Sequence, residues 1–257
     1  MKDMYDMMRK ITGDQRTDKL DLLIQKVNRL EKMHYSESMR LADTYSLSLL
    51  QPLIEGHPFL PFTASSLRPF CLVTILNDIR VNGRNKILEF GSGISSLMIG
   101  RLIKSEQLNA KLITIEHNEN WSNLLSELLK KEDLEGCVKV VYAPLTECDL
   151  SLESNKWYDR EAINKEAGEK TFDLMIVDGP PAFNPAEEKS RYPAVPYIFD
   201  KLQENCSIYL DDASRSGERF VLQAWEKKFS IKFQLKGGTL AHFTRGKSFF
   251  TEPFLFF

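Results

Sequence analysis

A short apolar run that ends in a glycine turn, residues 87–93 (ILEFGSG), constrains the fold of this chain more than any other segment. The run indicates a buried strand, and the apolar residues from Ile94 to Leu102 indicate a helix that starts directly after the turn. A strand, a tight glycine turn and a helix N-terminus with free N–H groups form a cradle of the kind that binds nucleotides. A second apolar strand ends in Glu116, which is placed to accept hydrogen bonds from a ribose. The sequence therefore predicts a site for a cofactor that contains adenosine.

Strands and helices alternate from Lys86 onward. Strands are expected at 86–90, 111–116, 138–142, 172–178, 206–211 and 231–235, with a last extended piece near 239–251. Helices are expected at 95–105, 119–131, 195–203 and 215–228. Some strands are continuous apolar runs, as expected when helices cover both faces of a sheet. The pattern predicts an α/β fold with a doubly wound, mainly parallel seven-stranded sheet.

The N-terminal part of the chain has a different character. Residues 1–17 are polar and expected to be irregular, and a helical pattern begins at Asp18. Its apolar seam repeats at steps of three and four residues: Leu20, Leu23, Val27 and Leu30. The seam fits two interpretations, a helix packed on the main domain or a short coiled coil that forms a homodimer.

A connector is expected after this helix, because residues 52–69 contain four prolines, which exclude a continuous helix. A helix at 69–80 then leads into the first strand. We therefore divide the chain into an N-terminal helical extension with its connector, residues 1–68, and a main domain, residues 69–257. The polar segment 151–170 is expected to be an irregular lid or insertion, and its Trp157 and Tyr158 either cover a ligand or anchor the segment.

Composition excludes several classes of protein. The chain has 257 residues, 42% of them hydrophobic and 27% charged, as in soluble globular proteins, and a net charge of −2 that gives no electrostatic reason to expect nucleic acid. No apolar run is long enough to span a membrane, and the N-terminus lacks the layout of a signal peptide. The four cysteines show no CxxC spacing and are expected to be free thiols. These features favour a cytoplasmic protein.

The residue before the glycine turn narrows the choice of cofactor. A dinucleotide fingerprint has three small residues, and Ser96 could take the third place after Gly91 and Gly93. However, Glu89 precedes the glycines, and its carboxylate would repel a pyrophosphate. A carboxylate here suits the cationic amino-acid group of S-adenosylmethionine, which carries no phosphate. This argument disfavours an NAD-dependent oxidoreductase.

Several strings resemble class I S-adenosylmethionine-dependent methyltransferases. They are residues 89–93 (EFGSG), 115–117 (IEH) and 172–178 (FDLMIVD). Further strings are similar to a bacterial group of small-molecule or glycan O-methyltransferases: 116–121 (EHNENW), 178–181 (DGPP), 191–194 (RYPA) and 211–215 (DDASR). The resemblance covers roughly residues 60–235 and implies the Rossmann-like methyltransferase fold, with S-adenosylmethionine as the cofactor.

The resemblance also implies roles for individual residues. The glycine turn would approach the methionine part of the cofactor, with Glu89 at its ammonium group directly or through water. Glu116 would hold both ribose hydroxyls, and the adenine would lie near His117 and Ala143. Asp178 would face the methyl-transfer site and act in catalysis. Residues implied to bind the cofactor are Glu89, Gly91, Ser92, Gly93, Glu116, His117, Ala143 and Asp178.

Three acids stand where neighbouring strands are expected to end: Asp178, Asp211 and Asp212. The trio resembles the metal ligands of cation-dependent O-methyltransferases, which implies Mg²⁺ or Mn²⁺, and a bound cation would lower the pKa of an acceptor hydroxyl. The Gly-Pro-Pro turn after Asp178 departs from that pattern. The alternative is that Asp211 and Asp212 cap the following helix and pair with Arg215.

The sequence gives less information about the methyl acceptor than about the cofactor. Arg191 and Tyr192 could bind an anionic or sugar-like acceptor by charge and stacking, or form only a surface ion pair. The leading hypothesis is methylation of a hydroxyl on a small molecule, sugar or glycan. N-methylation of another small acceptor is an alternative, but methylation of nucleic acid is disfavoured because Gly179 interrupts the Asp-Pro-Pro-aromatic turn and no basic face is evident. A non-catalytic assembly protein that binds the cofactor is the other alternative.

Overall fold

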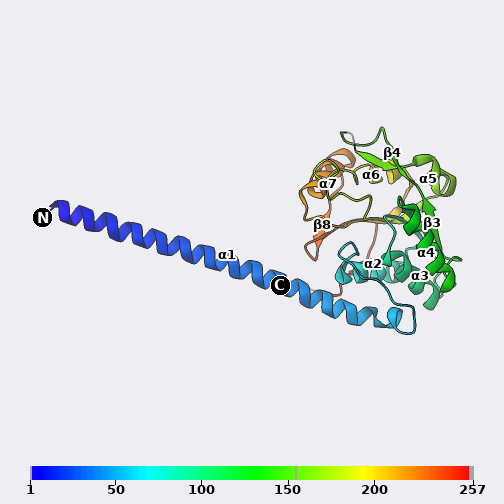
Figure 1. Cartoon of the computed structure of the whole chain (residues 1–257), viewed down its shortest axis with the longest axis horizontal. Helices are drawn as coiled ribbons and strands as arrows, with labels where there is room; N and C mark the ends of the chain where they lie inside the picture. The colour runs from blue at the N-terminus through cyan, green and yellow to red at the C-terminus, as the bar shows by residue number, and fades with distance from the viewer. Residues whose placement is uncertain (1, 154, 255–257) are drawn as a thin grey trace.

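The central sheet has seven strands in the order β3-β2-β1-β6-β7-β9-β8. The computed structural model describes the backbone of residues 2–153 and 155–254 and the side chains from residue 21 onward (Figure 1). The strands are β1 (Lys86–Phe90), β2 (Lys111–Glu116), β3 (Val138–Tyr142), β6 (Phe172–Val177), β7 (Leu202–Leu210), β8 (Gln234–Lys236) and β9 (Leu240–Arg245). All are parallel except β9, which runs antiparallel to both of its neighbours. The predicted doubly wound, mainly parallel sheet is confirmed.

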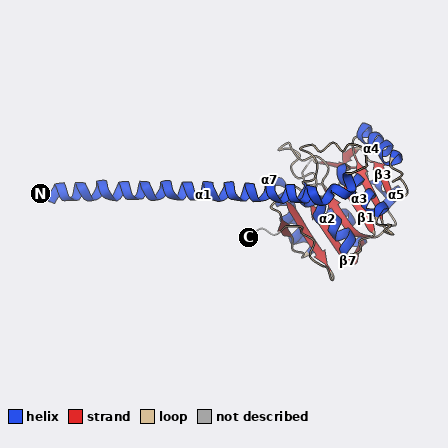
Figure 2. Cartoon of the chain, turned by 90° about the horizontal axis from the view of Figure 1, so that it is seen from below, coloured by secondary structure: helices blue, strands red, loops and turns tan. Residues whose placement is uncertain are grey.

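Helices cover both faces of the sheet (Figures 1 and 2). They are α2 (Pro69–Val81), α3 (Ile94–Ser105), α4 (Glu119–Lys131), α5 (Arg160–Ala167), α6 (Ala194–Ile198), the 3-10 turn η1 (Phe199–Lys201) and α7 (Ser216–Phe229). Buried side chains of α2, α3 and α4 form one hydrophobic core, and those of α5, α6 and α7 form the other. Strand β1 divides its side chains between them, with Ile87 in the first core and Leu88 and Phe90 in the second. This alternation is what a two-sided strand requires.

Several predicted element bounds differ from the structure. β8 begins three residues later than the predicted strand 231–235, and β9 ends at Arg245 rather than near 251. β7 begins four residues before the predicted strand, because Leu202 pairs with Phe172 across an irregularity in the register. The exposed Glu204 and Asn205 interrupt the apolar pattern and concealed this start. The predicted helix 195–203 corresponds to α6 and η1, which together end at Lys201.

The N-terminal helix α1 (Lys2–Ile54) is longer than the sequence indicated. Residues 2–17 are helical, so the prediction of an irregular segment was wrong. The helix also continues through Pro52 and ends two residues later, which shortens the connector to residues 55–68. A proline near the end of a helix removes one backbone donor and is followed here by the end of the helix.

Only the C-terminal part of α1 packs on the domain. Ala42, Ser46 and Leu50 are buried and face α2 across successive turns. The seam residues Leu23, Val27 and Leu30 are 58%, 51% and 63% exposed. This part of the helix projects away from the domain (Figure 2), so the interpretation that the seam packs on the domain was wrong.

The segment 151–170, predicted to be irregular, contains regular structure. A two-stranded antiparallel ribbon joins β4 (Leu145–Glu147) to β5 (Lys156–Tyr158), and α5 follows. The Asp159 side chain caps α5 by accepting a hydrogen bond from the Glu161 backbone N–H at 2.8 Å. Trp157 and Tyr158 are fully buried and anchor the segment, and Tyr158 also lines the cavity at the strand ends. A three-residue strand is too short to show a period in sequence.

Among the described residues, none of the helices combines the length and the apolar character that a membrane-spanning segment needs.

Candidate active site

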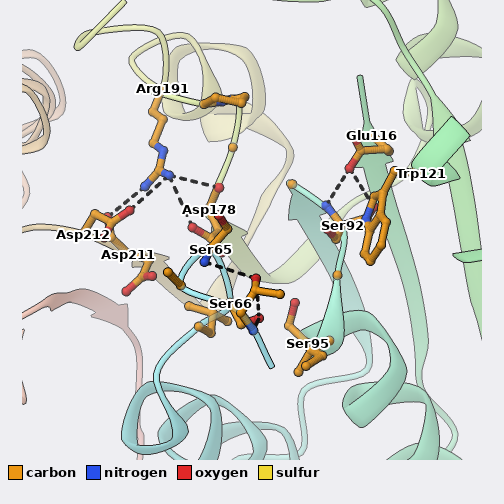
Figure 3. A pocket seen from close by; sticks show the side chains of 18 of the residues that line it. Ser65, Ser66, Ser92, Ser95, Glu116, Trp121, Asp178, Arg191, Asp211 and Asp212 are labelled. Atoms are coloured by element: carbon orange, nitrogen blue, oxygen red, sulfur yellow. Dashed lines mark hydrogen bonds and ion pairs between the residues drawn. The ribbon is translucent and has the colours of Figure 1, made fainter. Parts of the chain in front are cut away.

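A cavity of about 600 Å³ lies at the C-terminal edge of the sheet, where the strand order reverses between β1 and β6 (Figure 3). Residues at the ends of four neighbouring strands line it: Gly91 after β1, Glu116 in β2, Asp178 after β6 and Asp211 after β7. Ligands of doubly wound sheets bind at such a switch point, because the strand order leaves a crevice there.

The glycine turn brings β1 and β6 into close contact. Gly91 has φ +93°, and a Cβ there would lie 2.8 Å from both the Asp178 carbonyl carbon and the Gly179 nitrogen. A side chain is therefore excluded on both conformational and steric grounds. Gly93 differs, because its φ of 177° is ordinary extended backbone and a Cβ there would meet no atom within 4 Å. The two glycines thus have different structural requirements.

Glu116 is held as a carboxylate by several donors. Ser92 Oγ donates to its Oε2 at 2.7 Å, the Asn118 backbone N–H donates to Oε1 at 2.7 Å, and His117 Nδ1 lies 3.0 Å from Oε1. Burial favours the neutral form, but hydrogen bonds from His117, Asn118 and Ser92 outweigh it and lower the pKa of Glu116. The Trp121 indole donates to the Ser92 carbonyl at 3.1 Å and fixes the same turn. The charged acid and the glycine turn form one preorganised unit (Figure 3).

Glu89 was predicted to act on the cofactor directly or through water, and the structure places it outside the cavity. It is fully buried and does not line the cavity, because strand alternation places it, like Ile87, on the α3 side of β1. Ser96 Oγ donates to its Oε2 at 2.5 Å, and Oε1 has no partner among the described residues. Burial raises the pKa of Glu89, while hydrogen bonds from Ser95, Ser96 and Thr114 oppose the shift. Direct contact of this carboxylate with a ligand in the cavity is not available in this geometry.

The structure brings the three predicted acids together. Candidate ligand oxygens of Asp178, Asp211 and Asp212 all lie within 4.8 Å of one another. Burial and the neighbouring carboxylates Asp211 and Asp212 raise the pKa of Asp178, and Arg191 opposes this effect. Burial and the charge of Asp212 raise the pKa of Asp211 to about 7. The cluster therefore holds a proton acceptor suited to neutral pH.

The Arg191 guanidinium lies in the same cluster and is almost fully buried. It donates to the backbone carbonyls of Asp178 at 3.1 Å, Asp211 at 3.1 Å and Pro180 at 3.3 Å. Its Nη2 atom also lies 3.3 Å from Asp178 Oδ1 and 3.3 Å from Asp212 Oδ2 (Figure 3). The sequence did not predict this central position for Arg191.

Comparison with known proteins is consistent with this architecture. Residues 88–213 match the model of a methyltransferase domain family. Residues 88–213 therefore form a methyltransferase domain. A comparison with curated protein sequences finds no significant match.

Solved structures resemble the methyltransferase domain in fold. One is an unconfirmed caffeoyl-CoA O-methyltransferase from Staphylococcus aureus, with a TM-score of 0.53 and 16% identity over 83% of this chain and 100% of the other. An SAH-bound methyltransferase from Podospora anserina has a TM-score of 0.51 and 17% identity over 82% and 88%. An O-methyltransferase from Bacillus cereus in complex with SAH has a TM-score of 0.50 and 15% identity over 79% and 91%.

The acid cluster of this methyltransferase domain fits a divalent cation poorly. Its oxygens have the chemistry that Mg²⁺ or Mn²⁺ prefers. However, Arg191 is within ion-pair distance of both Asp178 and Asp212, and Arg215 lies 2.7 Å from Asp212. Two like unit charges about 4 Å apart repel by roughly 4 kcal/mol near a protein surface, and a divalent ion would double that. The predicted pairing of Asp212 with Arg215 is present, but Asp212 does not cap α7, which lacks a side-chain cap at its N-terminus.

Two more predicted residues, in addition to Glu89, lie outside the cavity of the methyltransferase domain. Ala143 is buried, and its backbone N–H donates to the Glu116 carbonyl at 2.7 Å, which continues the β2–β3 pairing. Tyr192 is buried in the second core, and its carbonyl accepts from the Trp225 indole at 2.8 Å. This position gives no support to substrate binding by the Tyr192 side chain. His117 does line the cavity, next to Glu116.

The other wall of the cavity comes from segments without predicted site roles. The connector contributes Pro61 and residues 63–68, and Phe183 and Arg215 lie on the same side as the acids. Arg68 anchors the connector through a hydrogen bond from Nε to Asp43 on α1 at 3.0 Å. The sequence signals were the Thr-Ala-Ser-Ser cluster within the connector and an aromatic residue after the Pro-Pro turn.

Proposed function

We propose that this methyltransferase transfers the methyl group of S-adenosylmethionine to a hydroxyl of a small molecule, with a sugar or glycan as the favoured acceptor. The observation that carries the proposal is the position of Asp178. This carboxylate lines the cavity between the glycine turn and the connector wall, and its pKa is raised by burial and by Asp211 and Asp212. A hydroxyl acceptor needs such a base, because its own pKa is far above neutral.

The reaction is an in-line displacement. A lone pair of the acceptor oxygen forms the new C–O bond while the S–CH₃ bond breaks, and the sulfonium becomes a neutral thioether. Asp178 accepts the hydroxyl proton, and a carboxylate oxygen of Asp211 lies within 4.8 Å of the Asp178 carboxylate. The protein contributes position and proton transfer, since the donor is already activated.

The cofactor would lie across the strand ends. Glu116 would bind the ribose hydroxyls, and the turn at Gly91, Ser92 and Gly93 would follow the methionine part. His117 and Trp121 both line the cavity beside Glu116, where the adenine would be placed. Glu89 would act on the ammonium group only through the Ser96 hydroxyl that it holds or through water.

A sugar-like acceptor is favoured by the lining of the connector wall. Thr63, Ser65 and Ser66 add hydroxyl groups to the lining of the cavity. Phe183 lies on the side of the acids and is 62% exposed, and the Arg215 guanidinium, which pairs with Asp212, lies 4.9 Å from its ring centroid. Hydroxyl and carboxylate groups beside an exposed aromatic ring suit a ligand with both polar edges and a flat apolar face.

An amine acceptor is the alternative, favoured by charge. The cluster has four acids, Asp178, Asp211, Asp212 and Glu218, against two guanidinium groups. A cationic amine would be attracted to this excess of negative charge.

The acceptor class can be tested directly. The protein is incubated with S-adenosylmethionine and separate panels of glycosides, catechols and primary amines, and methylated products are identified by mass spectrometry. We expect O-methylation in the hydroxyl panels. Methylation confined to the amines would contradict the proposal and support the alternative.

We also propose a cytoplasmic location, since all four cysteines are unpaired thiols.

A further inference from the structure

We propose that Arg191 takes the place of a divalent cation in the acid cluster, so that this methyltransferase works without a metal. The role of Arg191 in catalysis rests on the proposed function. The contacts of Arg191 with the acids do not depend on it. Arg191 is then a positioning residue, which holds Asp178 and Asp212 with a fixed positive charge.

The guanidinium is fixed by the backbone rather than by the acids alone. Three carbonyls accept from it, those of Asp178, Pro180 and Asp211, at 3.1 to 3.3 Å. These carbonyls belong to the turns after β6 and β7, the two strands that carry the acids. Because each of its three nitrogens has a carbonyl partner, Arg191 would keep its place if a carboxylate moved.

The Arg191 guanidinium lies between Asp178 and Asp212, where a cation bound by both carboxylates would lie. Nη2 lies 3.3 Å from Asp178 Oδ1 and 3.3 Å from Asp212 Oδ2, so a single nitrogen joins acids from two strands. Behind it, Nη1 lies 3.6 Å from Glu218 on α7. The side chain is 3% exposed, so water screens these charges little.

Asp212 also forms an ion pair with a second arginine. Arg215 Nη2 lies 2.7 Å from the same Asp212 oxygen that faces Arg191. A metal ion would have to replace the two ion pairs at Asp212 and come close to the buried Arg191 guanidinium. A guanidinium cannot lose its proton at accessible pH, so its charge is permanent.

Manganese binding separates this proposal from a metal-dependent site. Mn²⁺ is titrated into the wild-type protein, and bound ion is followed by electron paramagnetic resonance. The wild type is expected to leave Mn²⁺ free, whereas Arg191→Ala is expected to bind it, and the double variant Arg191→Ala with Asp212→Asn to lose it again. Arg191→Lys, which keeps the charge, is the matched control and is expected to leave Mn²⁺ free.

Two results would overturn the proposal. One is Mn²⁺ binding by the wild type that Asp212→Asn abolishes, together with loss of methyl transfer on chelation. The other is a folded Arg191→Ala variant that binds no Mn²⁺. If that variant does not fold, the wild-type titration decides. None of these Mn²⁺ measurements depends on cofactor binding. Failure of the proposed function would be detected in a different experiment, as failure to bind S-adenosylhomocysteine.

A different observation carries a second inference: the projecting part of α1 pairs with a second copy of this chain in a parallel coiled coil. Residues 21–36 are exposed, and the apolar seam has no partner among the described residues of the chain. Because the same seam is present in each copy, a two-fold axis along the helix would bury both seams at once.

Charge complementarity supports this occupant and its direction. With Leu23 and Leu30 at d positions and Val27 at an a position, Lys26 falls at g and Glu31 at the following e position. In parallel coiled coils a g residue faces the next e residue of the partner. Lys26 of one copy would therefore meet Glu31 of the other, twice per dimer.

Sedimentation of the full chain tests the pairing. The wild type is expected to be a dimer, and Leu30→Glu a monomer. Lys26→Glu is expected to weaken the dimer, and the charge swap Lys26→Glu with Glu31→Lys to restore it. Lys32→Glu, at the outward f position, is the control and should leave the dimer unchanged. A monomeric wild type, or a dimer unaffected by Leu30→Glu, would overturn the inference.

Discussion

Ser92 Oγ donates a hydrogen bond of 2.7 Å to Glu116 Oε2, so the turn after β1 is tied to the end of β2. The two residues stand 24 positions apart in sequence, Ser92 just after β1 and Glu116 at the end of β2, and these two strands are adjacent and parallel. This contact joins the glycine cradle to the acid proposed for the ribose. Binding of the cofactor then requires little ordering of the site, which reduces its entropic cost.

Replacing Glu116 should weaken cofactor binding. Glu116→Gln keeps the size of the side chain but removes a charge that strengthens its hydrogen bonds, which are each worth roughly 1.5–3 kcal/mol. We expect S-adenosylhomocysteine to bind about tenfold to a hundredfold more weakly in calorimetry. Glu119→Gln, an exposed acid three residues away in α4, is the matched control. Equal affinity of the two variants would reject the ribose role.

The two glycines of the turn should respond differently to alanine. Gly91→Ala adds a Cβ that would lie 2.8 Å from backbone atoms of Asp178 and Gly179, at φ +93°. We expect a loss of roughly 2 kcal/mol or more in the free energy of unfolding, measured with urea. Gly93→Ala should change it by less than about 1 kcal/mol, because the backbone there is extended and the space is open. Similar losses in both variants would show that the turn is not set by contact between β1 and β6.

Asp178 should matter for chemistry more than for cofactor affinity. Asp178→Asn removes the proposed proton acceptor, and general-base catalysis contributes about 10² to 10⁴ in rate. We expect methyl transfer to a hydroxyl to fall by that factor, while S-adenosylhomocysteine binds with similar affinity. Asp200→Asn, an exposed acid in η1, serves as the control. An active Asp178→Asn variant with an unchanged pH profile would contradict the role of the base.

Phe183 is expected to act on the acceptor alone. Phe183→Ala removes an aromatic face at the cavity wall, a contact worth roughly 1 kcal/mol. We expect about a fivefold rise in KM for a glycoside acceptor, with kcat and S-adenosylhomocysteine affinity unchanged. Phe249→Ala removes another exposed ring, which is 74% exposed and does not line the cavity, and should have no effect. If Phe183→Ala weakened S-adenosylhomocysteine binding, the ring would contact the cofactor rather than the acceptor, and the prediction would be wrong.

His242 makes stability depend on pH. Burial lowers its pKa from 6.5 to about 4, and the ring stacks on Tyr209 with centroids 4.4 Å apart. Between these pH values the unfolded chain binds a proton that the folded protein excludes, so stability falls as pH decreases through this window. The loss is on the order of 3 kcal/mol when complete. Urea unfolding at pH 7 and pH 5 should show a smaller decrease for His242→Gln than for the wild type. Equal decreases would show that His242 is not the group responsible.

The fold could be predicted because its signals are local. The apolar runs of β1 and β6 and the acid at the end of β2 are contiguous in sequence, and their order defines the sheet. The convergence of Asp178, Asp211 and Asp212 followed from parallel strands ending at one edge.

The rest of the site depends on distant contacts. Arg191 was predicted either to bind the acceptor or to form a surface ion pair, and only the turns after β6 and β7 place its guanidinium among the acids. Glu89 was expected at the cofactor, but strand alternation turns it toward Ser96. The connector lines the cavity only because Arg68 fixes it to Asp43, a contact between segments 25 positions apart that no local pattern encodes.

Isothermal titration calorimetry with S-adenosylhomocysteine tests the central claim most directly. We expect one molecule to bind per chain in the wild type, with affinity reduced in Glu116→Gln but not in Glu119→Gln, and no binding of NAD. Binding of NAD without S-adenosylhomocysteine, or no binding of either, would contradict the assignment of the cavity to a methyl donor.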